Sequence, residues 1–378
     1  MSTSDGDGLR AAILAQPDDD TLRLIYADWL QENDQPDRAA FVRAQVAIAQ
    51  AEPFGPQFRE RVRAADKLQG AHPEWGQHVR QKHRALSGWF ARGFIERVHV
   101  DAASFPRHAA ELFAAEPVRS VQVTRFASPA GGTVSLVPFF QVPELDRVTR
   151  LDLTGLQLSE SELELLADAP ELVNLTDLCL RGNAVQPVWL GELLTGLAMP
   201  ALAGLDLHGL VNHGPRLATV LPLLNRRLLR LDLGHIPFTS EQIKSMLESR
   251  CLREVEELRL AWMTGAGRAG VMTHLNLGWT IPWNRLRILD LSSQGVGDQG
   301  VKEIVLELTR RREPAPLRWL GLANNGIGAE GVRELVRSDP ERVKLYYLDL
   351  RLNNLTLSQR AALQTRFPEA VIRYDGAE

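Results

Sequence analysis

The motif Leu-x-x-Leu-x-Leu returns along most of this chain, and it constrains the possible folds more than any other feature. Clear copies are LTDLCL at 175–180, LAGLDL at 202–207, LRILDL at 286–291 and LRWLGL at 317–322. We number each copy by the Leu that opens its final Leu-x-Leu. The good copies are then Leu151, Leu178, Leu205, Leu231, Leu258, Leu289, Leu320 and Leu348, with valine versions at Val98 and Val121. Successive copies lie 23 to 31 residues apart, which accommodates one strand, one helix and their connections.

The physics of one unit can be read from the copy RLDLT at 150–154. Side chains alternate along a strand, so Leu151 and Leu153 point into a core while Arg150 and Asp152 face outward. A later segment, SESELELLADAP at 159–170, supplies a helix with a capping box of Ser and Glu at its start. One such unit cannot bury its apolar faces alone. Neighbouring units are therefore predicted to stack into a parallel sheet on one side and helices on the other.

Two runs carry a family resemblance, LSSQGVGDQGVKEIV at 291–305 and LANNGIGAEGVRELV at 322–336. They resemble the leucine-rich repeats of the ribonuclease-inhibitor class. The resemblance covers roughly residues 93–378 and implies an α/β horseshoe of about ten repeats, with a parallel concave sheet and convex helices. Solenoids of this class serve unrelated binding roles, so the resemblance does not identify a partner.

Residues 1–92 lack the repeat, and their apolar spacing predicts helices at 9–16, 20–33 and 37–50. The segment 9–50 resembles a bacterial repeat-companion domain, which implies no particular activity. Tyr26 and Trp29 are expected in the core of this segment. Residues 54–92 are expected to continue as helices, which makes 1–92 an all-α module that caps the first edge of a solenoid spanning 93–378.

Composition excludes several classes of protein. The 378 residues carry a formal net charge of −4 and no long basic block, which argues against nucleic acid as a partner. No apolar run approaches the length of a membrane helix, and the polar start MSTSDGDGLR is unlike a signal peptide. We therefore expect a cytoplasmic protein that does not bind membranes. The two cysteines, Cys179 and Cys251, exclude a disulfide framework.

No motif in the chain favours an enzyme, a cofactor or a metal. GAGRAG at 265–270 matches G-x-G-x-x-G, but AWMT stands between the preceding strand and the first glycine, so the tight turn that holds a pyrophosphate is missing. His208 is predicted beside Asp206 and near Asp232, an arrangement compatible with a proton relay or half a metal site. An exposed polar residue on a binding surface is the favoured interpretation, because the nine histidines are otherwise dispersed.

The outward positions of the predicted strands form the main candidate site. The central position reads Asp152, Cys179, Asp206, Asp232, Arg259, Asp290, Gly321 and Asp349 in successive copies. The arginines beside it are Arg150, Arg181, Arg230 and Arg351. Asp can pair with a neighbouring Arg and simply solvate the sheet. The functional alternative is that this acidic row, together with His208, recognises a protein partner with a basic surface.

The repeat is irregular between Leu258 and Leu289, where the sequence predicts a helix at 268–277 followed by the loop GWTIPWNR at 278–285. Three tryptophans gather in this segment: Trp262, Trp279 and Trp283. Clustered aromatic residues can form core. Tryptophan in a loop with Gly and Pro is also the kind of side chain that anchors a protein interface.

These observations favour a non-enzymatic scaffold that binds a protein through the concave face or through the Trp-rich loop. GTPase-activating proteins of the Ran type share this repeat class, which leaves a regulator of a small GTPase as the alternative. That role requires an Asn or Arg at the solenoid rim, for which Asn183, Asn325 and Arg181 are the candidates.

Overall fold

The computed structural model describes residues 3–126, 134–184, 194, 199–210, 214–262, 281–310 and 313–375. The fold is α/β, with strands that are mostly parallel. The chain divides into two compact units. Unit 1 comprises Met1–Leu156, Ala169–Leu175 and Ala198–Ala201, and unit 2 comprises Gln157–Asp168, Thr176–Leu197 and Leu202–Glu378.

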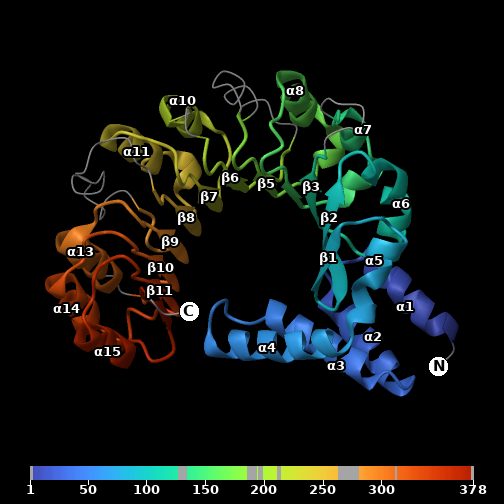
Figure 1. Ribbon diagram of the computed structural model, residues 1–378, viewed down its shortest axis with the longest axis horizontal. Helices are drawn as coiled ribbons and strands as arrows, with labels where there is room; N and C mark the ends of the chain where they lie inside the picture. The colour runs from blue at the N-terminus through green and yellow to red at the C-terminus, as the bar shows by residue number, and fades with distance from the viewer. Residues whose placement is uncertain are drawn as a thin grey trace. The chain divides into compact units, whose positions relative to one another are not determined.

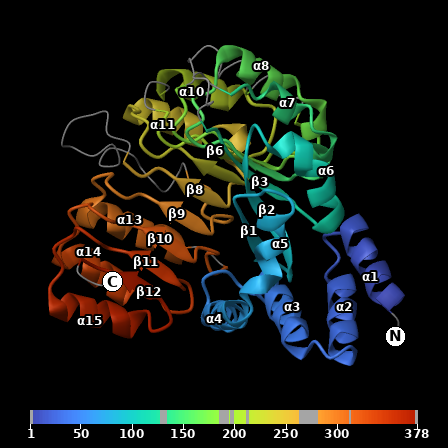
Figure 2. The same cartoon turned by 45° about the vertical axis from the view of Figure 1, so that its right-hand side comes forward.

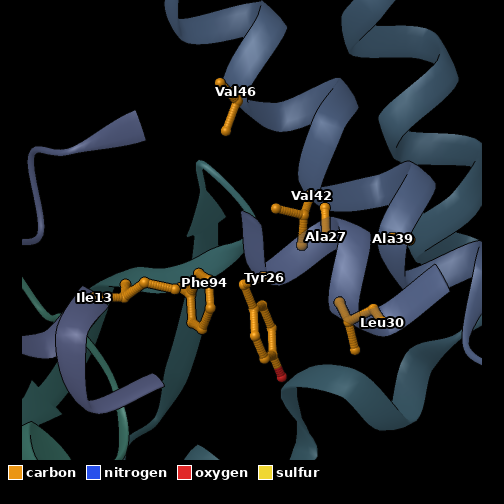
Figure 3. Packing of buried hydrophobic residues seen from close by; sticks show 8 residues of the cluster. All are labelled: Ile13, Tyr26, Ala27, Leu30, Ala39, Val42, Val46 and Phe94. Carbon is orange, nitrogen blue, oxygen red and sulfur yellow. The ribbon is translucent and has the colours of Figure 1, made fainter. Parts of the chain in front are cut away.

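Unit 1 begins with helices, as the sequence predicts. They are α1 (Thr3–Ala15), α2 (Asp20–Glu32), α3 (Pro36–Ala49), α4 (Pro56–Ala71) and α5 (Gln77–Gln81), with the short 3-10 helix η1 (Pro73–Gly76) before α5. The carboxylate of Asp19 starts α2 by accepting a hydrogen bond from the Thr21 N–H at 2.8 Å. Tyr26 is 6% exposed and Trp29 packs against the same cluster, so their predicted core role is confirmed. Figure 3 shows this cluster, in which Tyr26 and Phe94 lie beside Ile13 and the α2–α3 residues.

A buried ion pair joins α2 to the strands of unit 1. Arg23 is 0% exposed and its guanidinium lies 2.7 Å from the carboxylate of Glu96. The same guanidinium donates to the carbonyls of Pro17 at 2.5 Å and Arg92 at 3.0 Å. Burial lowers the pKa of Arg23 and raises the pKa of Glu96, so each charge depends on the other for its stability, and the two carbonyls further stabilise the guanidinium.

The strands of unit 1 begin within the segment that the sequence assigned to helices. They are β1 (Ser87–Ala91), β2 (Phe94–Asp101), β3 (Ser120–Thr124) and β4 (Arg150–Asp152). β1 pairs with β2 in an antiparallel hairpin, so the expectation that 54–92 is entirely helical is wrong at 87–91. The boundary predicted after residue 92 falls in the turn of this hairpin. Gly93 occupies that turn with φ 88°, and a Cβ there would collide with Val42 of α3.

The two valine copies of the motif form strands in unit 1. Val98 on β2 lies opposite Val121 on β3, which lies opposite Leu151 on β4, all in parallel register. The connecting elements are α6 (Phe105–Ala115), α7 (Val137–Phe140), η2 (Pro143–Arg147) and η3 (Pro170–Leu172).

Unit 2 repeats one strand and one helical segment several times. Its strands are β5 (Asp177–Cys179), β6 (Gly204–Asp206), β7 (Arg230–Asp232), β8 (Glu257–Arg259), β9 (Ile288–Asp290), β10 (Trp319–Gly321), β11 (Tyr347–Asp349) and β12 (Val371–Arg373). Neighbouring strands are parallel, and the Leu that numbers each copy lies opposite the Leu of the next. β12 extends this order with Ile372 opposite Leu348, although no full copy of the motif precedes it.

Helices line one side of the unit 2 strands (Figures 1 and 2). They are α8 (Glu160–Asp168), α10 (Gly214–Val220), α11 (Ser240–Leu247), α13 (Gly297–Thr309), α14 (Ala329–Arg337) and α15 (Leu357–Arg366), with the 3-10 helices η4 (Leu221–Leu223) and η5 (Arg250–Leu252). The predicted capping box of α8 is present, because Ser159 N–H donates to Glu162 at 2.9 Å and Glu162 N–H donates to Ser159 Oγ at 3.4 Å. No helix within the described ranges is long and apolar enough to cross a membrane.

Buried asparagines hold the turns that follow three strands, and they are Asn183, Asn325 and Asn353. The amide oxygen of Asn325 accepts hydrogen bonds from the N–H groups of Gln294 at 2.9 Å and Val296 at 3.2 Å. Its amide nitrogen donates to the Leu291 carbonyl at 2.9 Å. The side chain of Asn353 accepts hydrogen bonds from the N–H groups of Asn325 and Ile327 and donates to the Leu322 carbonyl. These asparagines therefore satisfy backbone groups of the preceding turn.

Gln294 occupies this same turn position one repeat before Asn325. Its side chain is 1% exposed, and neither atom of its amide group has a hydrogen-bond partner in the part of the chain that the structure describes. The corresponding residues of two earlier repeats are apolar, Leu210 and Ile236, and both are buried. The site therefore tolerates an apolar side chain and gains nothing from the glutamine amide.

We expect Gln294→Met to stabilise the protein by about 1 kcal/mol, because it removes a buried amide without partners and keeps the side-chain length. The matched control is Asn325→Leu, which leaves three backbone groups unpaired and should cost about 2 kcal/mol or more. Urea unfolding of both variants checks this. A loss of stability in Gln294→Met as large as that in Asn325→Leu would contradict it.

Candidate interaction site

The outward side chains of strands β5 to β11 and of the turns that follow them form what we call the open sheet face. Aspartates at the last position of four of these strands accept hydrogen bonds from the backbone two residues later. In each case a backbone N–H donates to an aspartate Oδ1, with nitrogen–oxygen distances of 2.9 to 3.1 Å. The pairs are His208 with Asp206, Gly234 with Asp232, Ser292 with Asp290 and Arg351 with Asp349. Each aspartate thus stabilises the turn out of its own strand. The repeated Asp has a structural role that the sequence alone did not assign.

An ion network crosses β5, β6 and β7. The guanidinium of Arg181 donates to Asp206 Oδ2 at 3.2 and 2.9 Å and to Asp232 Oδ2 at 3.2 Å. Asp232 has a side chain only 12% exposed, and burial together with the nearby Asp206 raises its pKa. Two carboxylates share one guanidinium, so the network carries one net negative charge when both are ionised.

Three rings lie side by side next to this network, and we call them the ring row: His208, His235 and Trp262. The His208 and His235 rings are 4.7 Å apart between centroids, and His235 stacks on Trp262 at 5.7 Å with 16° between planes. His208 Nδ1 lies 3.5 Å from Asp232 Oδ1. Trp262 remains 39% exposed. The row is therefore an aromatic strip with a carboxylate network along one end.

Backbone geometry explains how the ring row is built. His235 and Trp262 have φ values of 60° and 58°, at the turn position that Gly182 and Gly209 fill in the two preceding repeats. A left-handed conformation costs a non-glycine residue about 1 kcal/mol or more. Gly234 makes room for the row, because a Cβ there would collide with the imidazole of His208. The chain thus presents two large rings where neighbouring repeats have none.

Two further clusters lie on the open sheet face. Arg230 reaches across β6 to Asp177 on β5, with nitrogen–oxygen distances of 2.6 and 2.8 Å, above a glycine at position 204. Near β10, the guanidinium of Arg259 lies 5.1 Å above the Trp319 ring, which stacks on Tyr347 at 5.1 Å. Sequence reasoning missed this second stack, although the outward positions of adjacent strands could have indicated it.

The structure brings together some of the predicted site residues and separates others. Arg181, Asp206, His208 and Asp232 form one network, which Trp262 joins through His235. His235 was not predicted, since only its backbone conformation places it in the row.

The remaining predicted residues lie elsewhere. Arg351 pairs with Asp349 of its own repeat at 2.6 Å, and Arg150 and Asp152 belong to β4 in unit 1. Trp283 is 0% exposed, so its ring belongs to the core, as in the first of the two interpretations of the tryptophan cluster, and not to the exposed surface of the face. Trp279, GAGRAG and the helix predicted at 268–277 lie outside the described residues.

Within the described ranges, no group of three or more His, Cys, Asp or Glu side chains could hold a metal ion. Burial raises the pKa of Cys251, which keeps that thiol protonated. No protein-family model and no curated protein matches this chain.

We expect Asp232→Ala to destabilise the protein by about 1–3 kcal/mol, because it leaves the Gly234 N–H and part of Arg181 unpaired. The control is Asp28→Ala, whose side chain is 70% exposed and pairs with Arg43 on the surface. That change should stay within about 0.5 kcal/mol. Urea unfolding measures both. Equal midpoints for the two variants would show that the aspartates of the open sheet face are dispensable for folding.

We expect His235 to titrate below the ordinary histidine pKa of about 6.5, because lost hydration and then the neighbouring His208 disfavour its charged form. Its contribution to stability should therefore fall as the pH drops through that ordinary value, since the unfolded chain binds the proton first. In His208→Gln, the pKa of His235 should rise but stay below the ordinary value. Histidine ring NMR titrations test this, and an unchanged His235 pKa in the variant would disprove the coupling.

Proposed function

We propose that this chain is a non-enzymatic protein-binding scaffold of the leucine-rich-repeat type. In this proposal the strands form the concave sheet of a horseshoe, the helices lie on the convex side, and the N-terminal helices cap the first edge. The protein acts in the cytoplasm and binds its partner through the open sheet face. The single observation that carries the proposal is the ring row beside the Arg181 network.

The exposure of the ring row supports a binding role. Trp262 leaves more than a third of its surface in water while sitting in a left-handed turn, although glycine would fill that turn without strain. Partly exposed tryptophan flanked by polar groups is typical of the centre of a protein interface. Covering it with a partner removes apolar surface from water, worth about 25 cal/mol per Å².

The hydrogen bonds of the network support a scaffold over an enzyme. Both carboxylates, Asp206 and Asp232, already accept from a backbone N–H and from Arg181, which positions them as fixed acceptors. The GTPase-regulator alternative depends on Asn183 and Asn325, which are 3% and 4% exposed and hold backbone groups of the turns. Arg181, its third candidate, is held by two carboxylates. No observation favours that alternative.

The test is capture of partners from an extract of cells that express the protein, with Trp262→Ala and a matched control, Trp89→Ala. Trp89 is 42% exposed and lies in unit 1 beneath Arg97, so both variants remove a similar exposed ring. We expect Trp262→Ala to weaken capture of the specific partner by at least about tenfold, as truncation of an interface tryptophan does. Thermal melting confirms that both variants fold.

Undiminished capture by Trp262→Ala would overturn the proposed site. Loss of capture by Trp89→Ala alone would place the interface in unit 1.

A further inference from the structure

We propose that the ring row binds an arginine side chain of the protein partner, with the guanidinium stacked on Trp262 and attracted by the Arg181–Asp206–Asp232 network. This inference rests on the proposed function and names the chemistry of the partner. Its basis is a comparison between two tryptophans on the same face, one covered by an arginine and one not.

Trp319 is a tryptophan of the open sheet face whose ring an arginine already covers. The guanidinium of Arg259 lies 5.1 Å from its ring centroid, close to the 4.9 Å at which Arg97 lies over Trp89. Trp262 has no arginine over its ring in the part of the chain that the structure describes, and it is 39% exposed. Among the described residues its stacking neighbour is His235, and the exposed part of the indole is the surface on which we place the partner's planar cation.

The charges around the ring row favour a cation. Arg181 in the turn after β5, Asp206 on β6 and Asp232 on β7 sum to one negative charge when the carboxylates are ionised. The next charges on the face, Arg259 on β8 and Asp290 on β9, are of opposite sign. An acidic peptide would meet unfavourable potential here, and so would nucleic acid.

Arginine fits better than lysine because its guanidinium is planar and less strongly hydrated, so it stacks on an indole at lower cost. The carboxylate oxygens already accept hydrogen bonds, so they attract the partner's charge without a new bidentate pair. The proposal therefore predicts a contact dominated by stacking, with a contribution from the local field.

A charged ring beside the indole would oppose a cation. His208 lies 3.5 Å from Asp232, and His235 lies between His208 and Trp262. Lost hydration and then the neighbouring His208 lower the pKa of His235, so its imidazole is uncharged at neutral pH and leaves the negative charge of the network in place.

The experiment uses the full chain labelled with 5-fluorotryptophan, whose eight tryptophans are followed by fluorine NMR. The Trp262 resonance is assigned from its absence in Trp262→Phe. The probes are N-acetylarginine amide and its uncharged analogue N-acetylcitrulline amide. We expect a saturable shift of Trp262 with the arginine probe and about two- to fivefold weaker binding of citrulline. Trp319, already covered by Arg259, is the internal control and should not shift.

Equal binding of citrulline, a stronger effect of N-acetylaspartate amide, or equal shifts of Trp319 and Trp262 would each overturn the inference. If Trp262→Ala abolishes partner capture while the arginine probe shifts nothing, the inference fails and the proposed function stands. If arginine binds at Trp262 but capture is unaffected by Trp262→Ala, the ring row binds a guanidinium that is not the partner's, and the proposed function and the inference both fail.

Discussion

The burial of one leucine against the next across parallel strands is the interaction on which unit 2 depends. The leucines that number its copies are at most 3% exposed, and each lies opposite its counterpart on the neighbouring strand. A slip of one residue would place Asp206 or Asp232 in the core and a leucine in water. The register is therefore fixed by burial. A fixed register is what aligns outward residues from distant parts of the sequence at the spacing of strands, about 4.8 Å.

Local patterns in the sequence predicted much of this architecture, and long-range contacts explain most of what they missed. The alternation of Leu151 and Leu153, and the capping box at Ser159, each depend on residues close together in the chain, and both predictions hold. β1 was missed because its identity as a strand comes from pairing with β2, and the helical residues before it gave the opposite expectation. The buried Arg23 could not be foreseen either, since Glu96 lies far along the chain.

The candidate site shows the same division. The strand period placed Arg181, Asp206 and Asp232 on one face, and the structure joins them in one network. The period did not show that these aspartates also cap their own turns, because that bond depends on backbone conformation. His235 was missed for the same reason, since nothing in its neighbouring residues indicates a left-handed turn. Apolar content alone does not distinguish an exposed tryptophan from a buried one, which is why the sequence left both interpretations of Trp283 open and only the structure places it in the core.

The glycines of the open sheet face have a consequence for how such a surface changes during evolution. Because Gly204 and Gly234 have no side chain, side chains of neighbouring repeats occupy the space above them. The Arg230–Asp177 pair lies above Gly204, and His208 lies above Gly234. A substitution of either glycine by alanine would add a methyl group that displaces those side chains, although the residues that carry them would be unchanged. New recognition properties can therefore arise by mutation at residues that touch no partner. Comparisons of related surfaces that score only contact residues would overlook such substitutions.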